Sequence, residues 1–137
     1  MSSDKIARGM AVANATNIAT NATTLAEITQ YVTVADNGSD VYPIDMASRP
    51  YKNIRIATAD ADAKEVTVSN VPTGDAELFI ELTYANAAAI TWTLKAGSTV
   101  KWLAGSAPTL SAGKVYYIAA LTSDGGTTWR CNSVGGW

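Results

Sequence analysis

Acidic side chains are the residues of this sequence that come closest to a reactive or metal-binding group. They fall in two groups, Asp36, Asp40 and Asp45, and Asp60, Asp62 and Glu65. A glycosidase needs two carboxylates across a cleft, and a calcium site needs several oxygens that converge from one loop. Residues 36–40 read Asp-Asn-Gly-Ser-Asp, which lacks the spacing of a calcium loop and favours a turn. We therefore interpret the first group as a turn and residues 60–62 as a solvated loop.

Other chemistry is poorly supported by the residue types. The chain contains no histidine, so the commonest general base and metal ligand is missing. Its single cysteine, Cys131, cannot form an intrachain disulfide and is interpreted as a small packed hydrophobe. No glycine-rich phosphate-binding motif is present. We predict that the protein is not an enzyme and has no catalytic residues, cofactor or metal.

Composition limits the partners. The 137 residues are 47% hydrophobic and 16% charged, with a net charge of −2. No run of Lys and Arg forms the basic patch that nucleic-acid binding requires. Apolar stretches are too short for membrane insertion, and residues 1–5 lack the apolar core of a signal peptide. We expect synthesis in the cytoplasm without Sec export.

The elements that would position these residues begin with a heptad pattern over residues 11–28. Residues with a and d spacing recur every seven positions: Ala11, Ile18 and Leu25, and Asn14, Asn21 and Ile28. This pattern predicts a helical stalk over residues 11–29 in which three chains meet and these six residues line the trimer axis. A frayed, Ala-rich tail is the alternative. Asparagine at d positions resembles the stalks of trimeric autotransporter adhesins and phage fibres, and the resemblance implies that Asn14 and Asn21 face the axis.

From residue 30 onward the hydrophobic period changes to two. Alternating segments predict eight or nine short strands, among residues 31–34, 41–46, 52–56, 65–68, 77–84, 90–94, 100–102, 115–121 and 127–134. Asp124-Gly125-Gly126 predicts a tight hairpin between the last two. The predicted fold class is mostly β: an antiparallel β-sandwich or jelly-roll-like knob over residues 30–137, preceded by the short helical trimeric coiled coil.

The last third carries a family resemblance. Five pieces appear in order: Ile90-Thr91-Trp92, Val100-Lys101-Trp102, Gly105-Ser106-Ala107-Pro108-Thr109-Leu110, Gly113-Lys114-Val115 and Asp124-Gly125-Gly126-Thr127-Thr128-Trp129. Residues 90–131 resemble the C-terminal β-domain of phage tail-fibre and other virion surface proteins. The resemblance implies a structural or adhesive virion role and no catalytic residue. A chain of 137 residues fits a head fibre or decoration protein at least as well as a tail fibre.

Tryptophans are the candidate ligand-binding residues. Trp92, Trp102 and Trp129 occupy strand positions and are expected in the core, with an exposed platform for sugar rings as the alternative. Trp137 follows two glycines and is either tucked into a neighbouring subunit or exposed. We take Trp102 and Trp137 as the candidates for ligand binding.

These expectations combine into one functional hypothesis. Residues 1–10 anchor the protein to a phage capsid or tail protein, residues 11–29 form the trimerisation stalk, and residues 30–137 form the knob. The predicted protein is a homotrimeric bacteriophage head fibre or decoration protein on the virion surface that aids host attachment. The alternative is a tail-associated receptor-binding protein that recognises a host surface glycan.

Overall fold

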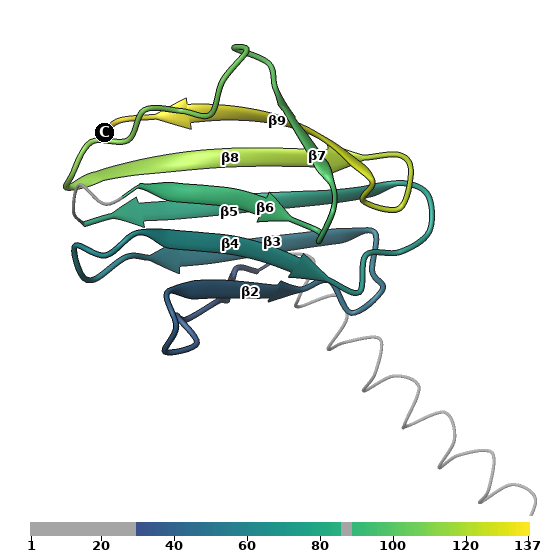
Figure 1. The fold of residues 1–137 in the computed structure, drawn as a ribbon, viewed down its shortest axis with the longest axis horizontal. Helices are drawn as coiled ribbons and strands as arrows, with labels where there is room; N and C mark the ends of the chain where they lie inside the picture. Colours follow the sequence, from purple (N-terminus) through teal and green to yellow (C-terminus); the bar gives the residue numbers. More distant parts are fainter. Residues whose placement is uncertain (1–29, 86–88) are drawn as a thin grey trace, which may run out of the picture. The chain divides into compact units, whose positions relative to one another are not determined.

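The computed structural model describes residues 30–85 and 89–137, and every regular element within them is a β-strand (Figure 1). Their bounds are β1 (Val32–Thr33), β2 (Val41–Asp45), β3 (Tyr51–Ala57), β4 (Lys64–Ser69), β5 (Ala76–Tyr84), β6 (Ile90–Leu94), β7 (Thr99–Trp102), β8 (Lys114–Thr122) and β9 (Thr128–Gly135). Eight or nine strands were predicted and nine are present in the described residues, so the period-two pattern of this region is confirmed.

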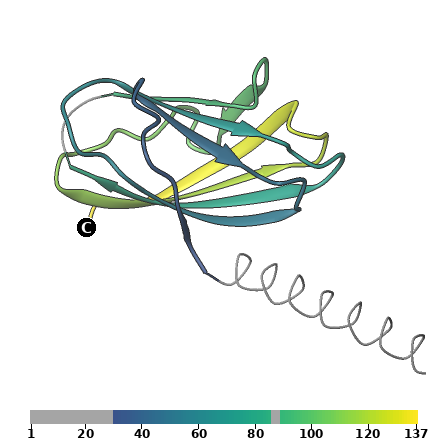
Figure 2. The same ribbon diagram turned by 90° about the horizontal axis from the view of Figure 1, so that it is seen from below.

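The first six strands wind back and forth between two sheets. β1, β3 and β5 belong to a six-stranded sheet of order β1-β3-β5-β8-β9-β7, whereas β2, β4 and β6 form a three-stranded sheet in that order. Figure 1 shows the smaller sheet in front of the larger one, and Figure 2 shows the two layers from another side. Val32 pairs with Ile54 and Lys64 with Ile90, so the chain returns to the same sheet after 22 and 26 residues.

This winding corrects the predicted fold class. Successive neighbours among the first six strands are parallel, as in a β-solenoid, and the larger sheet is mixed rather than antiparallel. The antiparallel sandwich or jelly roll behind a helical stalk is therefore wrong for the described residues, which contain no helix. The physical reason is that alternation fixes which side chains face the core but leaves the direction of the neighbouring strand open.

The last three strands complete the larger sheet. β8 pairs antiparallel with β5 and with β9, and β7 lies parallel to β9 at the edge. The β8–β9 turn contains Gly125 and Gly126 with φ of 69° and 86°, so the predicted hairpin is confirmed. The Thr122 hydroxyl oxygen accepts a hydrogen bond from the Gly126 amide at 2.9 Å. The Asp124 carboxylate accepts one from the Thr128 amide at 2.8 Å, which closes the turn.

The hydrophobic core lies between the two sheets. Alternate residues of the larger sheet point inward, including Ile54, Leu78, Ile80, Leu82 and Ile118, which are at most 1% exposed. Ile44 and Val66 approach them from the smaller sheet. Full burial of such a side chain stabilises the fold by about 1.5–3 kcal/mol. Packing between the two layers therefore stabilises the β-domain that presents the surfaces described below.

Two predicted segments lie outside the described residues. The anchor (1–10) and the stalk (11–29), with the trimer-axis positions Ala11, Asn14, Ile18, Asn21, Leu25 and Ile28, fall in residues 1–29. Contacts divide the chain into the units Met1–Gln30 and Tyr31–Trp137, and the fold above is that of the second unit. Within residues 30–85 and 89–137, no helix is long and apolar enough to cross a membrane.

Candidate functional site

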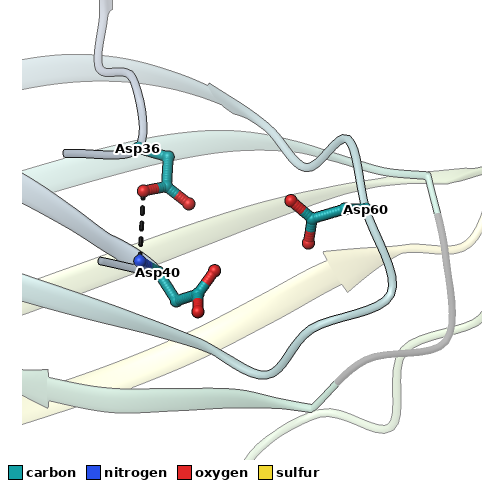
Figure 3. Close-up of side chains that lie close together, drawn as sticks. All are labelled: Asp36, Asp40 and Asp60. Carbon is teal, nitrogen blue, oxygen red and sulfur yellow. Dashed lines mark hydrogen bonds between the residues drawn. The ribbon is translucent and has the colours of Figure 1, made fainter. Parts of the chain in front are cut away.

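A charged cluster sits around the first residue of β4. Lys64 belongs to the inward-facing set of that strand, and its side chain is only 1% exposed. Its ammonium is 3.1 Å from Asp36 Oδ2 and 2.7 Å from Asp60 Oδ1, and it also pairs with Asp40. Asp36 and Asp40 come from the loop before β2, and Asp60 from the loop before β4. Figure 3 shows the three carboxylates turned toward a common point.

Local turn chemistry holds two of these acids in place. Asp36 Oδ1 accepts hydrogen bonds from the Gly38 amide at 2.7 Å and the Asp40 amide at 3.1 Å. The hydrogen bond that the Gly38 amide donates to Asp36 is the largest cause that lowers the pKa of this carboxyl group, and the Lys64 ammonium lowers it further. Hydrogen bonding to Lys64 lowers the pKa of Asp60, and the pairs with Asp40 and Asp60 raise the pKa of Lys64. All three shifts favour the ionised forms.

The same geometry bears on metal binding. One carboxylate oxygen each from Asp36, Asp40 and Asp60 lies within 4.8 Å of the others, as ligands of one ion would. The Lys64 ammonium already contacts these carboxylates and supplies the positive charge that a metal would bring. The cluster is therefore an internal ion-pair network that fastens the β1–β2 and β3–β4 loops to β4. The predicted turn at residues 36–40 is confirmed, whereas the interpretation of residues 60–62 as merely solvated misses the contact with Lys64.

A second candidate is the outer face of the larger sheet, which we define by the outward side chains of β3, β5, β8 and β9. The register places these side chains in three rows across the strands: Tyr51, Glu77, Leu121 and Arg130; Asn53, Phe79, Ala119 and Asn132; and Arg55, Glu81, Tyr117 and Val134. Six apolar or aromatic side chains therefore lie among charged and amide groups on this face: Tyr51, Phe79, Tyr117, Ala119, Leu121 and Val134. A sheet face of this composition suits contact with another molecule better than exposure to water alone.

Aromatic rings continue this face at both ends. The rings of Phe79 and Tyr117 stack with centroids 5.7 Å apart and an angle of 22° between their planes. Tyr31 extends the row at 6.3 Å from Phe79, and Trp137 contacts Tyr117 edge-on at 5.6 Å. The Arg55 guanidinium lies 4.9 Å from the centre of the Tyr31 ring, within cation–π range. Four rings therefore form a continuous row over the sheet.

A hollow of about 410 Å³ opens at one end of the outer face. Its lining includes Tyr51 and Leu121 as apolar groups and Asp75, Glu77 and Arg130 as charged groups. Tyr51 is 53% exposed and Leu121 48% exposed, which is high for side chains of this size. The lining of the hollow thus combines apolar side chains with charges of both signs.

The predicted tryptophans lie in different surroundings. Trp129 is fully buried, and Trp92 is 9% exposed, which confirms that both belong to the core. Trp102 is partly buried and contacts Trp92 edge-on at 5.7 Å. Trp137 is 65% exposed in the single chain, which agrees with both of its predicted states. The structure does not bring Trp102 and Trp137 together as one ligand site.

Cys131 is buried at 4% exposure, as its interpretation as a packed hydrophobe requires. Burial raises the pKa of its thiol to about 12, so the unreactive protonated form prevails at neutral pH.

Sequence reasoning did not single out Lys64 or the outer face. A signal for Lys64 was available, because it shares the parity of Val66 and Val68, which face the core. The rows of the outer face depend on the parallel register between β3 and β5, which alternation alone does not reveal. Comparison with known proteins adds no further residue, since no family model, curated protein or solved structure matches this chain.

Proposed function

We propose that this chain is a non-enzymatic structural protein of a bacteriophage particle, a short trimeric fibre or decoration protein on the virion surface. The supporting observation is that the segments resembling virion β-domains pack as one unit. Trp102 of β7 pairs in register with Cys131 of β9, and Pro108 and Thr109 of the following loop line a hollow with Asn132 of β9. The hairpin turn at Gly125-Gly126 joins β8 to β9 within this unit.

The edges of the larger sheet also support a discrete assembly. β1 has two residues and β7 has four, and these short strands form the two edges. Short edge strands offer few free backbone groups for open-ended pairing with other chains. Association through side chains into a closed trimer is therefore favoured over sheet extension. The proposed partners are two further copies of the chain and a capsid or tail protein that binds residues 1–10.

Two measurements test this proposal. Light scattering on the purified full chain is expected to give three chain masses at micromolar concentration. Mass spectrometry of purified phage particles, with immunogold electron microscopy, is expected to find the protein at the particle surface after synthesis in the host cytoplasm. A monomer in solution contradicts the trimer, and absence from purified particles contradicts the virion role.

Exposed tryptophan supports the second candidate function, recognition of a host surface glycan. Trp137 is 65% exposed and stands beside Tyr117, so one large aromatic surface is open to a sugar ring. Under this alternative, Trp137→Ala is expected to abolish glycan binding on a glycan array while the trimer persists. Leu103→Ala is the matched control because Leu103 is 80% exposed and apolar but belongs to a loop.

A further inference from the structure

Exposed apolar side chains of the described residues concentrate on the outer face. Among the five large hydrophobic side chains that are exposed, Tyr51, Leu121 and Val134 lie on this face, and Trp137 contacts its Tyr117. Val134 is 58% exposed. Leaving such groups in water is unfavourable, and concentration on one sheet face is typical of an interaction surface.

The ring geometry indicates what kind of molecule covers this face. Side chains stand roughly perpendicular to a sheet, and Phe79 and Tyr117 stack on each other with an interplanar angle of 22°. Each ring therefore covers one face of the other and turns an edge outward. Sugar rings stack on open aromatic faces, whereas aliphatic and aromatic side chains of a protein pack well against ring edges. The stacked pair of Phe79 and Tyr117 thus suits a protein surface better than a glycan.

The charges of the outer face fit a copy of the same chain as that protein surface. Arg55 and Glu81 already pair with each other at 3.0 Å. Glu77 of β5 and Arg130 of β9 are both exposed, lie on either side of Leu121, and enter no ion pair with another described side chain. The four charges sum to zero, so two such faces do not repel each other. One negative and one positive group are left to pair between copies.

We infer that the outer face is the surface through which copies of this chain pack around a three-fold axis, with Glu77 of each copy paired to Arg130 of the next. This inference rests on the proposed trimer and specifies its interface. With the face turned to the axis, the β3–β5 half of one copy meets the β8–β9 half of the next. Because Leu121 lies between Glu77 and Arg130 on the face, the three Leu121 side chains then meet near the axis, and the repeated Glu77–Arg130 contact closes the ring after three copies.

The test uses the full chain and two kinds of variant. Leu121→Asp places a charge at the apolar centre of the contact, and its matched control is Leu103→Asp, which changes a more exposed leucine outside the outer face. Glu77→Arg and Arg130→Glu each put like charges opposite one another, and the double variant restores opposite charges. Sedimentation equilibrium measures the trimer dissociation constant, and circular dichroism confirms that each variant is folded.

We expect Leu121→Asp and each single charge reversal to raise the trimer dissociation constant by about tenfold or more. Leu103→Asp is expected to leave this constant unchanged, and the double reversal is expected to bring it close to the wild-type value. A wild-type trimer whose association none of these variants alters overturns the inference and leaves the proposed trimeric function standing. A monomeric wild type overturns both. A variant that keeps its trimer but loses binding on a glycan array assigns the outer face to a glycan and also overturns the inference.

Discussion

Burial of the Lys64 ammonium shapes the local structure at the start of β4. A charge taken out of water is strongly unfavourable unless partners replace its hydration. The side chain is 1% exposed, and Asp36, Asp40 and Asp60 supply carboxylates on the sides where water is excluded. Because these acids come from two loops, the ammonium fixes the loops as well as itself.

Lys64→Met tests this role through pH. The pKa of Asp36 and Asp60 lies below the usual 3.8 and that of Lys64 above the usual 10.5, so wild-type stabilisation is full between these values. It is lost as pH falls below 3.8 or rises above 10.5. In Lys64→Met, three carboxylates repel each other at neutral pH and become neutral on acidification. The Tm deficit of the variant is therefore expected at pH 7 and shrinks below pH 3.8 in differential scanning calorimetry.

Lys101→Met is the control for that measurement, because Lys101 is exposed on the edge strand β7. Its Tm is expected to follow wild type at every pH. A deficit in Lys64→Met that persists unchanged at acid pH would contradict the charge argument and attribute the loss to packing.

Calcium distinguishes a resident ammonium from a vacant metal site. In wild type the ammonium contacts all three carboxylates, so millimolar Ca²⁺ is expected to leave the Tm unchanged. The three carboxylate oxygens lie within 4.8 Å of one another in the wild-type chain, and Lys64→Met removes the cation between them. Ca²⁺ is then expected to raise the Tm by a few degrees, measured by thermal shift with Mg²⁺ as the competing ion. A clear rise in wild type would show that the metal displaces Lys64.

At the residue scale, sequence reasoning could identify the turn at Asp36 because turn chemistry is local. It could not place Asp60 beside Asp36, since these residues are 24 positions apart. They come together only because β2 and β4, which follow them in the chain, pair in parallel. A charged residue in phase with the buried positions Val66 and Val68 is the local sign that a buried ion pair exists, but its partners are set by the topology.

At the scale of elements, the positions of the strands were predictable and their pairing was not. Leu78, Ile80 and Leu82 alternate with outward residues, and this alternation identifies β5 whatever lies beside it. β5 in fact has a parallel neighbour, β3, on one side and an antiparallel one, β8, on the other. The hairpin between β8 and β9 was predictable because two glycines mark a short connection. No local sequence signal of this kind marks the parallel pairing of the first six strands.

Gly135→Ala tests the close approach of β9 to β8. Gly135 has φ of 153°, and a Cβ there would lie 2.6 Å from the Tyr116 Cα and the Val115 carbonyl oxygen. Both are backbone atoms, so the strands must separate at this point. The free energy of unfolding is expected to fall by about 1–3 kcal/mol in urea denaturation.

Gly136→Ala separates the clash from backbone strain, because Gly136 also has a positive φ, of 102°, but nothing lies within 4 Å of the added atom. Its loss of stability is expected to be the smaller of the two. Equal losses would mean that strain alone matters and that the approach to Tyr116 is relaxed.

At the scale of the whole molecule, the two faces of the larger sheet differ in burial. The inner faces of the two sheets form the core, and the Lys64 cluster closes one end of the space between them. The outer face of the larger sheet is the broad apolar surface that this packing leaves uncovered. The trimer proposed above uses this face of the second unit, which contains none of residues 1–10.

Deletion of residues 1–10 tests whether assembly and attachment are separate. The deletion removes none of the residues that define the outer face, which all lie between 51 and 134. The truncated chain is therefore expected to fold and to sediment as a trimer like wild type. It is expected to be missing from phage particles when it replaces the full chain during infection, as measured by mass spectrometry of purified virions. Leu121→Asp is the complementary variant, because it weakens the trimer but keeps residues 1–10. Each dissociated chain can still attach through its own residues 1–10, but the added strength of three linked attachments is lost, so incorporation is expected to be reduced. Normal incorporation of the truncated chain would refute the anchor and place the virion contact on residues 11–137.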